Sequence, residues 1–270
     1  METGTNEIAM GVRRFGRVNW LGLQTLAHRE IRRFWAVWTQ TLAAPLVTAG
    51  LFLTIFTLAI GPTRGDVMGV PFIHFLAPGI LTMTVIQNAF ANTSSSIVIS
   101  KVQGNIVDTL MPPLSPIELV LGYLAGGLVR GLIVAVAIWS AMALFVGLGL
   151  AHPVFALTFI TLGALLLGAL GIMAGIISQK FDQMAAITNF VITPLSFLSG
   201  TFYSVENLPH WFRVLTHMNP VFYLIDGVRY GVIGQSDSSP WLGLAVLGSV
   251  TGAVIFGVWV LFKRGTKLKS

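Results

Sequence analysis

Long apolar, uncharged runs alternate with short polar segments along this chain. Each run has roughly the 20 residues that a helix needs to cross the hydrocarbon core of a bilayer. We therefore predict an all-α membrane protein with one transmembrane helix for each run. The six predicted spans cover residues 35–60, 71–100, 119–150, 154–177, 184–202 and 241–262.

The segment before the first span, residues 18–34, follows a helical pattern. Its apolar residues recur every three or four positions and share one face; they are Trp20, Leu23, Ala27, Ile31 and Phe34. The opposite face holds Arg29, Arg32 and Arg33. We expect an amphipathic helix that lies along the membrane surface with these arginines towards the headgroups. A soluble helix packed on a partner is the alternative.

A polar, proline-rich loop, residues 101–118 (KVQGNIVDTLMPPLSPIE), separates the second and third spans. Its Gly104–Leu110 part can form about two turns of helix, and the prolines that follow stop the helix and stiffen the return. A simple turn needs only a few residues, so this length and apolar content favour a docking site for a soluble partner. The candidate docking residues are Gly104, Asn105, Ile106, Asp108, Leu110 and Pro112.

Polar residues inside the second and third spans are candidates for a translocation path. The second span contains Gln87, Asn88 and Asn92. Amides are costly to expose to lipid, so they are expected to face protein or a water-filled path; path lining and helix–helix contact both remain open. Arg130 lies in the third span. We interpret it as an anchor near the cytoplasmic edge; the alternative is an inward-facing arginine that bonds one of these three amides.

The segment between the fifth and sixth spans, residues 203–239, mixes charged residues with aromatic and aliphatic ones. Its prolines divide it into pieces too short to cross a bilayer. Backbone lies at membrane depth only where protein or water shields it. We therefore predict a re-entrant pair of short helices that caps the bundle externally, with an ordinary external loop as the alternative. Its candidate residues are Glu206, Pro209, Pro220, Tyr223 and Arg229.

Glycines recur at four-residue spacing in two of the spans. They are Gly122, Gly126, Gly127 and Gly131 in the third span and Gly171 and Gly175 in the fourth. Such spacing lets helix backbones approach closely in lipid. Packing within one subunit and a seam between two copies both remain open.

The composition agrees with a membrane protein and limits its chemistry. The chain is 54% hydrophobic and 10% charged, whereas soluble domains have roughly 25% charged residues. It has no cysteine, no Gly-rich phosphate loop, no His-Glu-x-x-His pair and no Gly-x-Ser-x-Gly elbow. Its five histidines are scattered along the sequence. We therefore predict no catalytic site, no metal site and no cofactor bound by this chain.

The basic residues are divided unevenly between the two sides of the six-span arrangement. Of 16 lysines and arginines, twelve lie on the side of both chain ends, three lie on the other side, and Arg130 lies within a span. Basic residues stay on the cytoplasmic side. Both termini are therefore predicted to be cytoplasmic, with residues 1–17 a disordered tail and 263–270 a basic tail. This distribution explains the net charge of +6 without nucleic acid as a partner.

Five stretches of the chain form a recognisable set: REIRRFWAVWTQTLAAP, FLAPGILTMTVIQNAFANTSSS, GNIVDTLMPPLSPIEL, GGLVRG and FDQMAAITNFVITPLSFLSGTFYSVENLPHWFRVLTHMNPVFYLIDGVRYG. Together they resemble the integral membrane subunits of type-two ABC exporters, a family of polysaccharide, nodulation-factor and drug-efflux permeases. The resemblance covers nearly the whole chain, and the last stretch is its most specific part.

The resemblance implies six transmembrane helices, a surface helix before the first, a coupling helix in the 101–118 loop and a re-entrant helical pair before the sixth. It also implies a bacterial inner membrane complex of two permease subunits and two ABC ATP-binding subunits, with ATP and Mg on the partner ATPase. By this analogy, closure of the ATPases pushes on Gly104–Leu110 and opens a path to the outside between the permeases.

We therefore expect a permease subunit of an ATP-driven ABC exporter that works as a homodimer with separate ATPases. The sequence does not distinguish this from a heterodimer. The competing hypothesis is an ATP-independent secondary transporter or channel, which would be marked by an acidic residue deep in a span; none of the ten acids lies clearly there. A third hypothesis, a membrane-bound enzyme, is not favoured because the sequence contains no catalytic motif. Lipids, glycans and hydrophobic drugs all fit the sequence as substrates.

Overall fold

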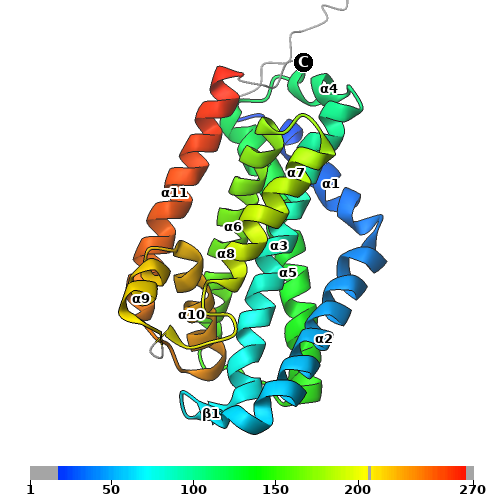
Figure 1. The fold of residues 1–270 in the computed structure, drawn as a ribbon. Coiled ribbons are helices and arrows are strands. Elements are labelled where there is room, and N and C mark those ends of the chain that lie inside the picture. Colours follow the sequence, from blue (N-terminus) through cyan, green and yellow to red (C-terminus); the bar gives the residue numbers. More distant parts are fainter. Residues whose placement is uncertain (1–17, 206–207, 266–270) are drawn as a thin grey trace, which may run out of the picture.

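The computed structural model describes residues 18–205 and 208–265, which form a bundle of long helices running along a common direction (Figure 1). The predicted tail of residues 1–17, Glu206 of the predicted re-entrant segment and residues 266–270 of the basic tail lie outside the described residues. The long helices are α2 (Trp38–Arg64), α3 (Phe72–Val102), α5 (Pro116–Val146), α6 (Pro153–Ile177) and α11 (Pro240–Arg264).

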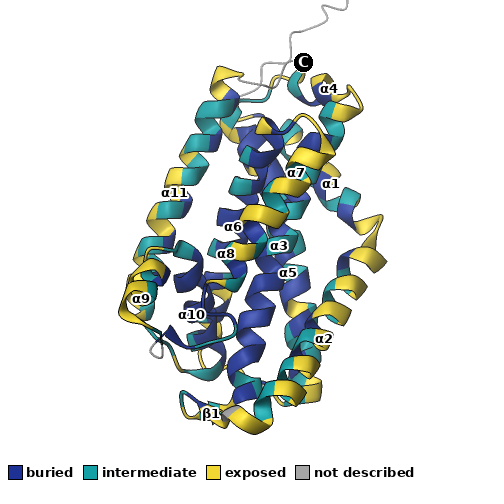
Figure 2. Cartoon of the chain, viewed as in Figure 1, coloured by how far each residue is buried: buried dark blue, intermediate teal, exposed yellow. Residues whose placement is uncertain are grey.

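In the described part of the chain, five helices are long and apolar enough to cross a membrane, and they are the five just named. The predicted all-α membrane fold is thereby confirmed. Helix α3 lies at the centre, packed against α2, α5 and α6. It is mostly buried, whereas few residues of α2 and α11 are buried (Figure 2). The helices packed around α3 therefore shield it and the polar side chains that it holds.

The fifth predicted span, residues 184–202, differs from the other five. Here α7 (Phe181–Ile187), the π-helical turn η1 (Thr188–Ile192) and α8 (Thr193–Phe197) follow one another directly. The helix ends at Phe197 rather than at 202, because Gly200 takes a left-handed φ of 77° that a continuing helix does not allow. A π-turn interrupts the α-helical pattern. This segment is not among the five candidate spans, and the count of six stays a prediction.

A tight hairpin connects α2 to α3. Strand β1 (Asp66–Val67) pairs antiparallel with β2 (Val70–Pro71), and Gly69, with a φ of 75°, permits the turn between them. Helix α3 begins directly after the hairpin and continues through Pro78 for 31 residues, which is about 47 Å. It therefore extends beyond a hydrocarbon core of roughly 30 Å.

Glycines allow α1 (Trp20–Trp35), α3, α5 and α6 to pack closely. A Cβ added to Gly126 of α5 would lie 2.5 Å from the Cβ of Glu30 on α1. A Cβ on Gly171 of α6 would lie 2.2 Å from Oγ1 of Thr93 on α3. Contacts this close leave no room for a larger residue. Of the two interpretations of these glycines, packing within one subunit and a seam between two copies, the structure shows the first.

Two short helices, α9 (His210–His217) and α10 (Pro220–Ile233), occupy the segment before α11. Pro209 takes the N-cap position of α9. Pro220 is the first residue of α10, where a missing N–H costs nothing because that group has no helical acceptor. Helix α10 packs against α3, α6 and α11 and is almost wholly buried, including Tyr223 at 8% exposure. The pair of helices exists; its depth in the membrane stays a prediction.

Candidate functional site

The predicted docking loop leaves α3 after Val102 and enters α5 at Pro116, with α4 (Ile106–Leu110) between them. Gly104 has a φ of 73°, a left-handed conformation that favours glycine. It therefore lies outside the helix, and Asn105 occupies the N-cap position without a side-chain capping bond. The helix has five residues, so the prediction of two turns from Gly104 to Leu110 was too long.

Both ends of this loop are held in place. The N–H of Ser115 donates to Oε2 of Glu118 at 2.7 Å, and the N–H of Glu118 donates to Oγ of Ser115 at 3.4 Å. Oε1 of Glu118 also accepts a hydrogen bond from the N–H of Asn19 at 2.7 Å, which joins the start of α1 to the start of α5. At the other end, the ammonium of Lys101 donates to the carbonyl of Gly175 at 3.1 Å. The loop is thus fixed to α1, α5 and α6.

The side chains of α4 divide into an inward and an outward face. Ile106 and Thr109 are buried, with 7% and 4% exposure. Asp108 is exposed, as are Val107 and Met111 at 53% and 76%. Ile106 packs into the apolar core on the inward side of α4, and its contact with a partner stays a prediction. Val107 and Met111 were not among the predicted docking residues. They are four positions apart and lie on a different face from Ile106 and Thr109, and this spacing is the signal that could have identified them.

A groove of about 400 Å³ separates the docking loop from α1. Asp108 and Pro112 border it on the loop side, and Leu21 and Thr25 border it on the α1 side. Leu110 is partly buried and packs against the apolar core beneath the loop. Asp108 and Pro112 therefore lie at an accessible surface, whereas Leu110 supports the loop from below.

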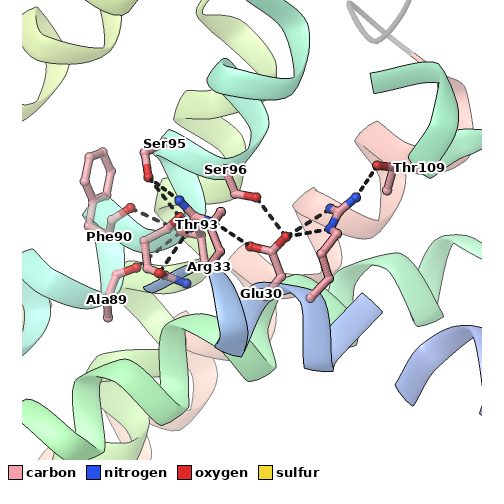
Figure 3. Close-up of polar contacts among 10 residues, drawn as sticks. Glu30, Arg33, Ala89, Phe90, Thr93, Ser95, Ser96 and Thr109 are labelled. Atoms are coloured by element: carbon pink, nitrogen blue, oxygen red, sulfur yellow. Dashed lines mark hydrogen bonds and ion pairs between the residues drawn. The ribbon is translucent and has the colours of Figure 1, made fainter. Parts of the chain in front are cut away.

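A chain of polar contacts leads from α4 to a buried carboxylate on α1 (Figure 3). Nη1 of Arg29 donates to Oγ1 of Thr109 at 2.6 Å, and its Nη2 pairs with Oε1 of Glu30 at 2.9 Å. Oγ of Ser96, on α3, donates to the same Glu30 oxygen at 2.9 Å. Glu30 has 0% exposure. A buried charge is tolerated only when it is paired and hydrogen-bonded, and these partners supply both.

Arg33 extends the contacts from Glu30 into α3. Its Nε lies 3.4 Å from Oε2 of Glu30. Its Nη1 donates to Oγ of Ser95 at 3.2 Å, and its Nη2 donates to Oδ1 of Asn92 at 3.1 Å. The predicted path residue Asn92 is thereby joined to the docking loop through α1. We name these residues the arginine–glutamate network: Thr109, Arg29, Glu30, Ser96, Arg33, Ser95 and Asn92.

The arginine–glutamate network adds contacts to α1 that its sequence did not predict. Arg29 and Arg33 bond within the bundle, although Arg29 also keeps 43% of its side chain exposed. The side chain of Arg32 is exposed and makes no such bond in the described residues. Helix α1 packs against α5, and Leu26 lies against Gly122. The periodicity of one helix cannot show which polar partners a second helix offers, and the contact of these arginines with headgroups stays a prediction.

The positive charge of Arg29 is stabilised by its neighbours. Burial lowers the pKa of its guanidinium, but Tyr123 and Glu30 raise it, and the net result is a pKa above the ordinary value. The guanidinium also lies over the Tyr123 ring, 5.9 Å from its centroid. Arg29 is therefore a cation where it contacts α4.

Arg130 of α5 faces the second predicted span. Its Nη2 donates to Oδ1 of Asn88 on α3 at 2.9 Å. The interpretation as an edge anchor was therefore wrong, and the alternative, an inward-facing arginine bonded to an amide, is what the structure has. Gln87 and Asn88 are partly exposed, whereas Asn92 is fully buried. Asn92 is thus a helix–helix contact, and a path lined by Gln87 and Asn88 stays a prediction.

Arg229 of α10 is the largest fully buried side chain in the described part of the protein. Its Nη2 donates to the carbonyl of Gly200 at 2.6 Å, and its Cζ lies 4.1 Å from the centroid of the Phe75 ring on α3. Its Nη1 lies 3.7 Å from Asp226 and 3.5 Å from Asp237. Arg229 therefore holds α10 against α3 and the turn that follows α8.

Within residues 18–205 and 208–265, no group of three or more histidine, aspartate and glutamate side chains could hold a metal ion. The side chains that the fold brings together at the docking loop and along α3 are arginines, a carboxylate, hydroxyls and amides. Such groups serve ion pairing and hydrogen bonding. The absence of a bound cofactor stays a prediction.

Several known proteins are similar to this chain. The family model described as ABC-2 type transporter matches residues 22–233. The inner membrane transport permease YadH of Escherichia coli (strain K12) is 36% identical over 251 residues, which are 93% of this chain and 98% of YadH. Nodulation protein J of Sinorhizobium fredii is 25% identical over 221 residues, 80% of this chain and 84% of that protein. The probable multidrug ABC transporter permease YbhR of E. coli is 27% identical over 199 residues, 70% of this chain and 52% of YbhR. The resemblance found in the sequence is confirmed.

Proposed function

The chain belongs to the ABC-2 type transporter family, and we propose that it is the permease subunit of an ATP-driven exporter in a bacterial inner membrane. Two copies form the translocation path, separate ABC ATP-binding subunits dock on the 101–118 loop, and both termini face the cytoplasm. The relatives support this proposal, since YadH is named an inner membrane transport permease and YbhR a probable multidrug ABC transporter permease.

The outward face of α4 is the observation that carries the proposal. Val107 and Met111 expose apolar surface at one end of the bundle, and Asp108 adds a carboxylate between them. On the inward side, Thr109 bonds Arg29. A helix that is exposed on one face and anchored on the other suits a contact through which a partner moves the bundle. Force on α4 would pass through the arginine–glutamate network to Asn92 of α3.

The competing hypothesis, a secondary transporter, needs an acidic side chain that is free to bind a proton or a sodium ion. Glu30 is fully buried, so it comes closest to this description. Its Oε1 accepts hydrogen bonds from Arg29 and Ser96, and its Oε2 is paired with Nε of Arg33 at 3.4 Å without a hydrogen bond. A carboxylate held in this way is a structural ion pair, which favours transport driven by a partner subunit.

Partly exposed amides support a path between two copies. Gln87 and Asn88 are partly exposed on α3, and Asn189 is exposed on η1. Its neighbour Phe190 is 81% exposed, so this stretch of helix lacks cover within the chain. An amide that faces lipid is costly, and we therefore place Asn189 against a second copy or a water-filled path. Asn189 was not among the predicted path residues.

Co-purification tests the docking. Full-length tagged chain, purified from its own host in mild detergent, should retain an ABC ATPase that hydrolyses ATP. The Met111→Glu variant should retain roughly tenfold less, because it replaces apolar contact worth about 1.5–3 kcal/mol with a buried charge.

Met218→Glu is the matched control. Met218 follows α9 and is 77% exposed, almost as much as Met111 at 76%, but it lies in the segment proposed to be external. This variant should retain the ATPase at the wild-type level. A wild-type chain that never retains an ATPase, or equal losses in both variants, would contradict docking at α4.

A further inference from the structure

A cavity at the same end of the bundle is left unexplained by ATPase docking. It has a volume of about 460 Å³ and lies where α1, the end of α3 and the start of α4 meet. This volume falls in the range of ligand sites in proteins, about 300–1,000 Å³. The lining residues that concern its chemistry are Arg29, Arg32, Arg33, Ser100, Gln103 and Asn105.

The lining has an excess of positive charge. Arg29, Arg32 and Arg33 line it together with Glu30 and Asp108, so three positive charges against two negative ones leave a net charge of +1. Glu30 is already paired with Arg29 and Arg33. Arg32 is exposed, and its guanidinium makes no hydrogen bond or ion pair with any residue that the structure describes. Its guanidinium therefore presents all of its donors to a ligand.

Neutral donors complete the lining. Oε1 of Gln103 accepts a hydrogen bond from Nδ2 of Asn105 at 3.3 Å, and the amide nitrogens of both side chains are hydrogen-bond donors. Ser100, in the last turns of α3, contributes a partly exposed hydroxyl. An arginine fork beside amide and hydroxyl donors matches an oxyanion, and phosphate suits the guanidinium geometry particularly well.

The position of α1 indicates where such a phosphate comes from. Trp20 and Trp35, at the two ends of α1, are 65% and 56% exposed, and Trp38 is 55% exposed. Exposed tryptophans gather at the membrane–water interface, so the cavity lies at headgroup level. Basic pockets between helices on the cytoplasmic side bind anionic headgroups. We propose that this cavity binds the phosphate headgroup of an anionic lipid, with Arg32 as its main ligand.

Native mass spectrometry of the full-length chain, released from nanodiscs that contain phosphatidylglycerol and phosphatidylcholine, tests the site. Wild type should retain phosphatidylglycerol over phosphatidylcholine. Arg32→Gln should retain about tenfold less, because it removes the hydrogen bonds of a charged donor. Arg32→Lys should retain an intermediate amount, since it keeps the charge without the fork. Lys263→Gln, which changes an exposed basic residue at the end of α11, should retain the wild-type amount.

A competition experiment with inorganic phosphate distinguishes a lipid headgroup from free phosphate as the ligand. If lipid retention depends on Arg32, the headgroup site is supported, whether or not free phosphate competes with the lipid. Free phosphate that binds through Arg32 while no lipid is retained overturns it. Equal retention of the two lipids, or full retention by Arg32→Gln, overturns it as well. The midpoint of thermal unfolding checks that the variants fold. No ATPase takes part, so a failure here leaves the proposed docking at α4 untouched.

Discussion

Glu30 joins α1 to α3 and α4 although it has no exposed surface. Glu30→Gln keeps the shape of the side chain and removes the charge that Arg29 and Arg33 face. Removing one partner of a buried ion pair costs about 3–5 kcal/mol. Water screens part of this interaction because Arg29 is 43% exposed. We therefore expect the free energy of unfolding to fall by about 2–3 kcal/mol. Chemical or thermal unfolding in detergent measures it.

Asp182→Asn provides the control for this charge removal. Asp182 is exposed in the first turn of α7, so its variant should unfold like the wild type. If Glu30→Gln also unfolded like the wild type, the buried carboxylate would not hold α1 against α3, and the arginine–glutamate network would lose its central contact.

At the scale of single residues, the sequence identified polar side chains better than it identified their partners. Asn88 was among the partners considered for Arg130, and the two do bond. The preferred interpretation failed because the distance from Arg130 to the end of its own apolar run says nothing about a neighbouring helix. Val107 and Met111 were missed for a related reason: which face of α4 is buried depends on the helices beneath it.

At the scale of elements, Gly126 sets the distance between α1 and α5. A Cβ there would lie 2.5 Å from the Cβ of Glu30 and 3.0 Å from Nδ2 of Asn92. Gly126→Ala should therefore push the helices apart and destabilise the protein by about 1–3 kcal/mol, although alanine favours an isolated helix by about 1 kcal/mol. Gly252→Ala on α11, where no atom lies within 4 Å, should be neutral or stabilising. The unfolding midpoint of Gly126→Ala should fall and that of Gly252→Ala should stay or rise, and equal shifts would contradict the close approach.

Helix boundaries were predictable where proline marks them. Helices α5, α6 and α11 begin at Pro116, Pro153 and Pro240, within three residues of the predicted starts at 119, 154 and 241. The end of the fifth predicted span was not predictable, because the left-handed φ of Gly200 depends on the turn that follows the helix. The π-helical turn Thr188–Ile192 within it has no signature in hydrophobic periodicity. The helix predicted in the docking loop was too long because the left-handed φ of Gly104 depends on the turn that the whole loop makes.

At the scale of the whole molecule, orientation rests on the basic residues and can be tested cleanly because the chain has no cysteine. The end of α11 and α4 lie at one end of the bundle and the β1–β2 hairpin lies at the other (Figure 1). Lys263→Cys and Asp66→Cys place one thiol at each end. A membrane-impermeant maleimide should label Asp66→Cys on intact cells and Lys263→Cys only after permeabilisation. The reverse pattern would contradict cytoplasmic termini.

The proposed homodimer makes a prediction about η1. Asn189 is exposed in the middle of an apolar helix, and a two-fold axis that covers it brings the same helix of the second copy nearby. Asn189→Cys should therefore form a covalent dimer, as a disulfide where the two Cα atoms come within about 7 Å or with a bis-maleimide where a path separates them. Phe256→Cys, on α11 and 63% exposed, should stay monomeric with the same reagents. Dimers from both variants would indicate random collision in the membrane, and no dimer from Asn189→Cys at any linker length would contradict a copy-to-copy path at η1.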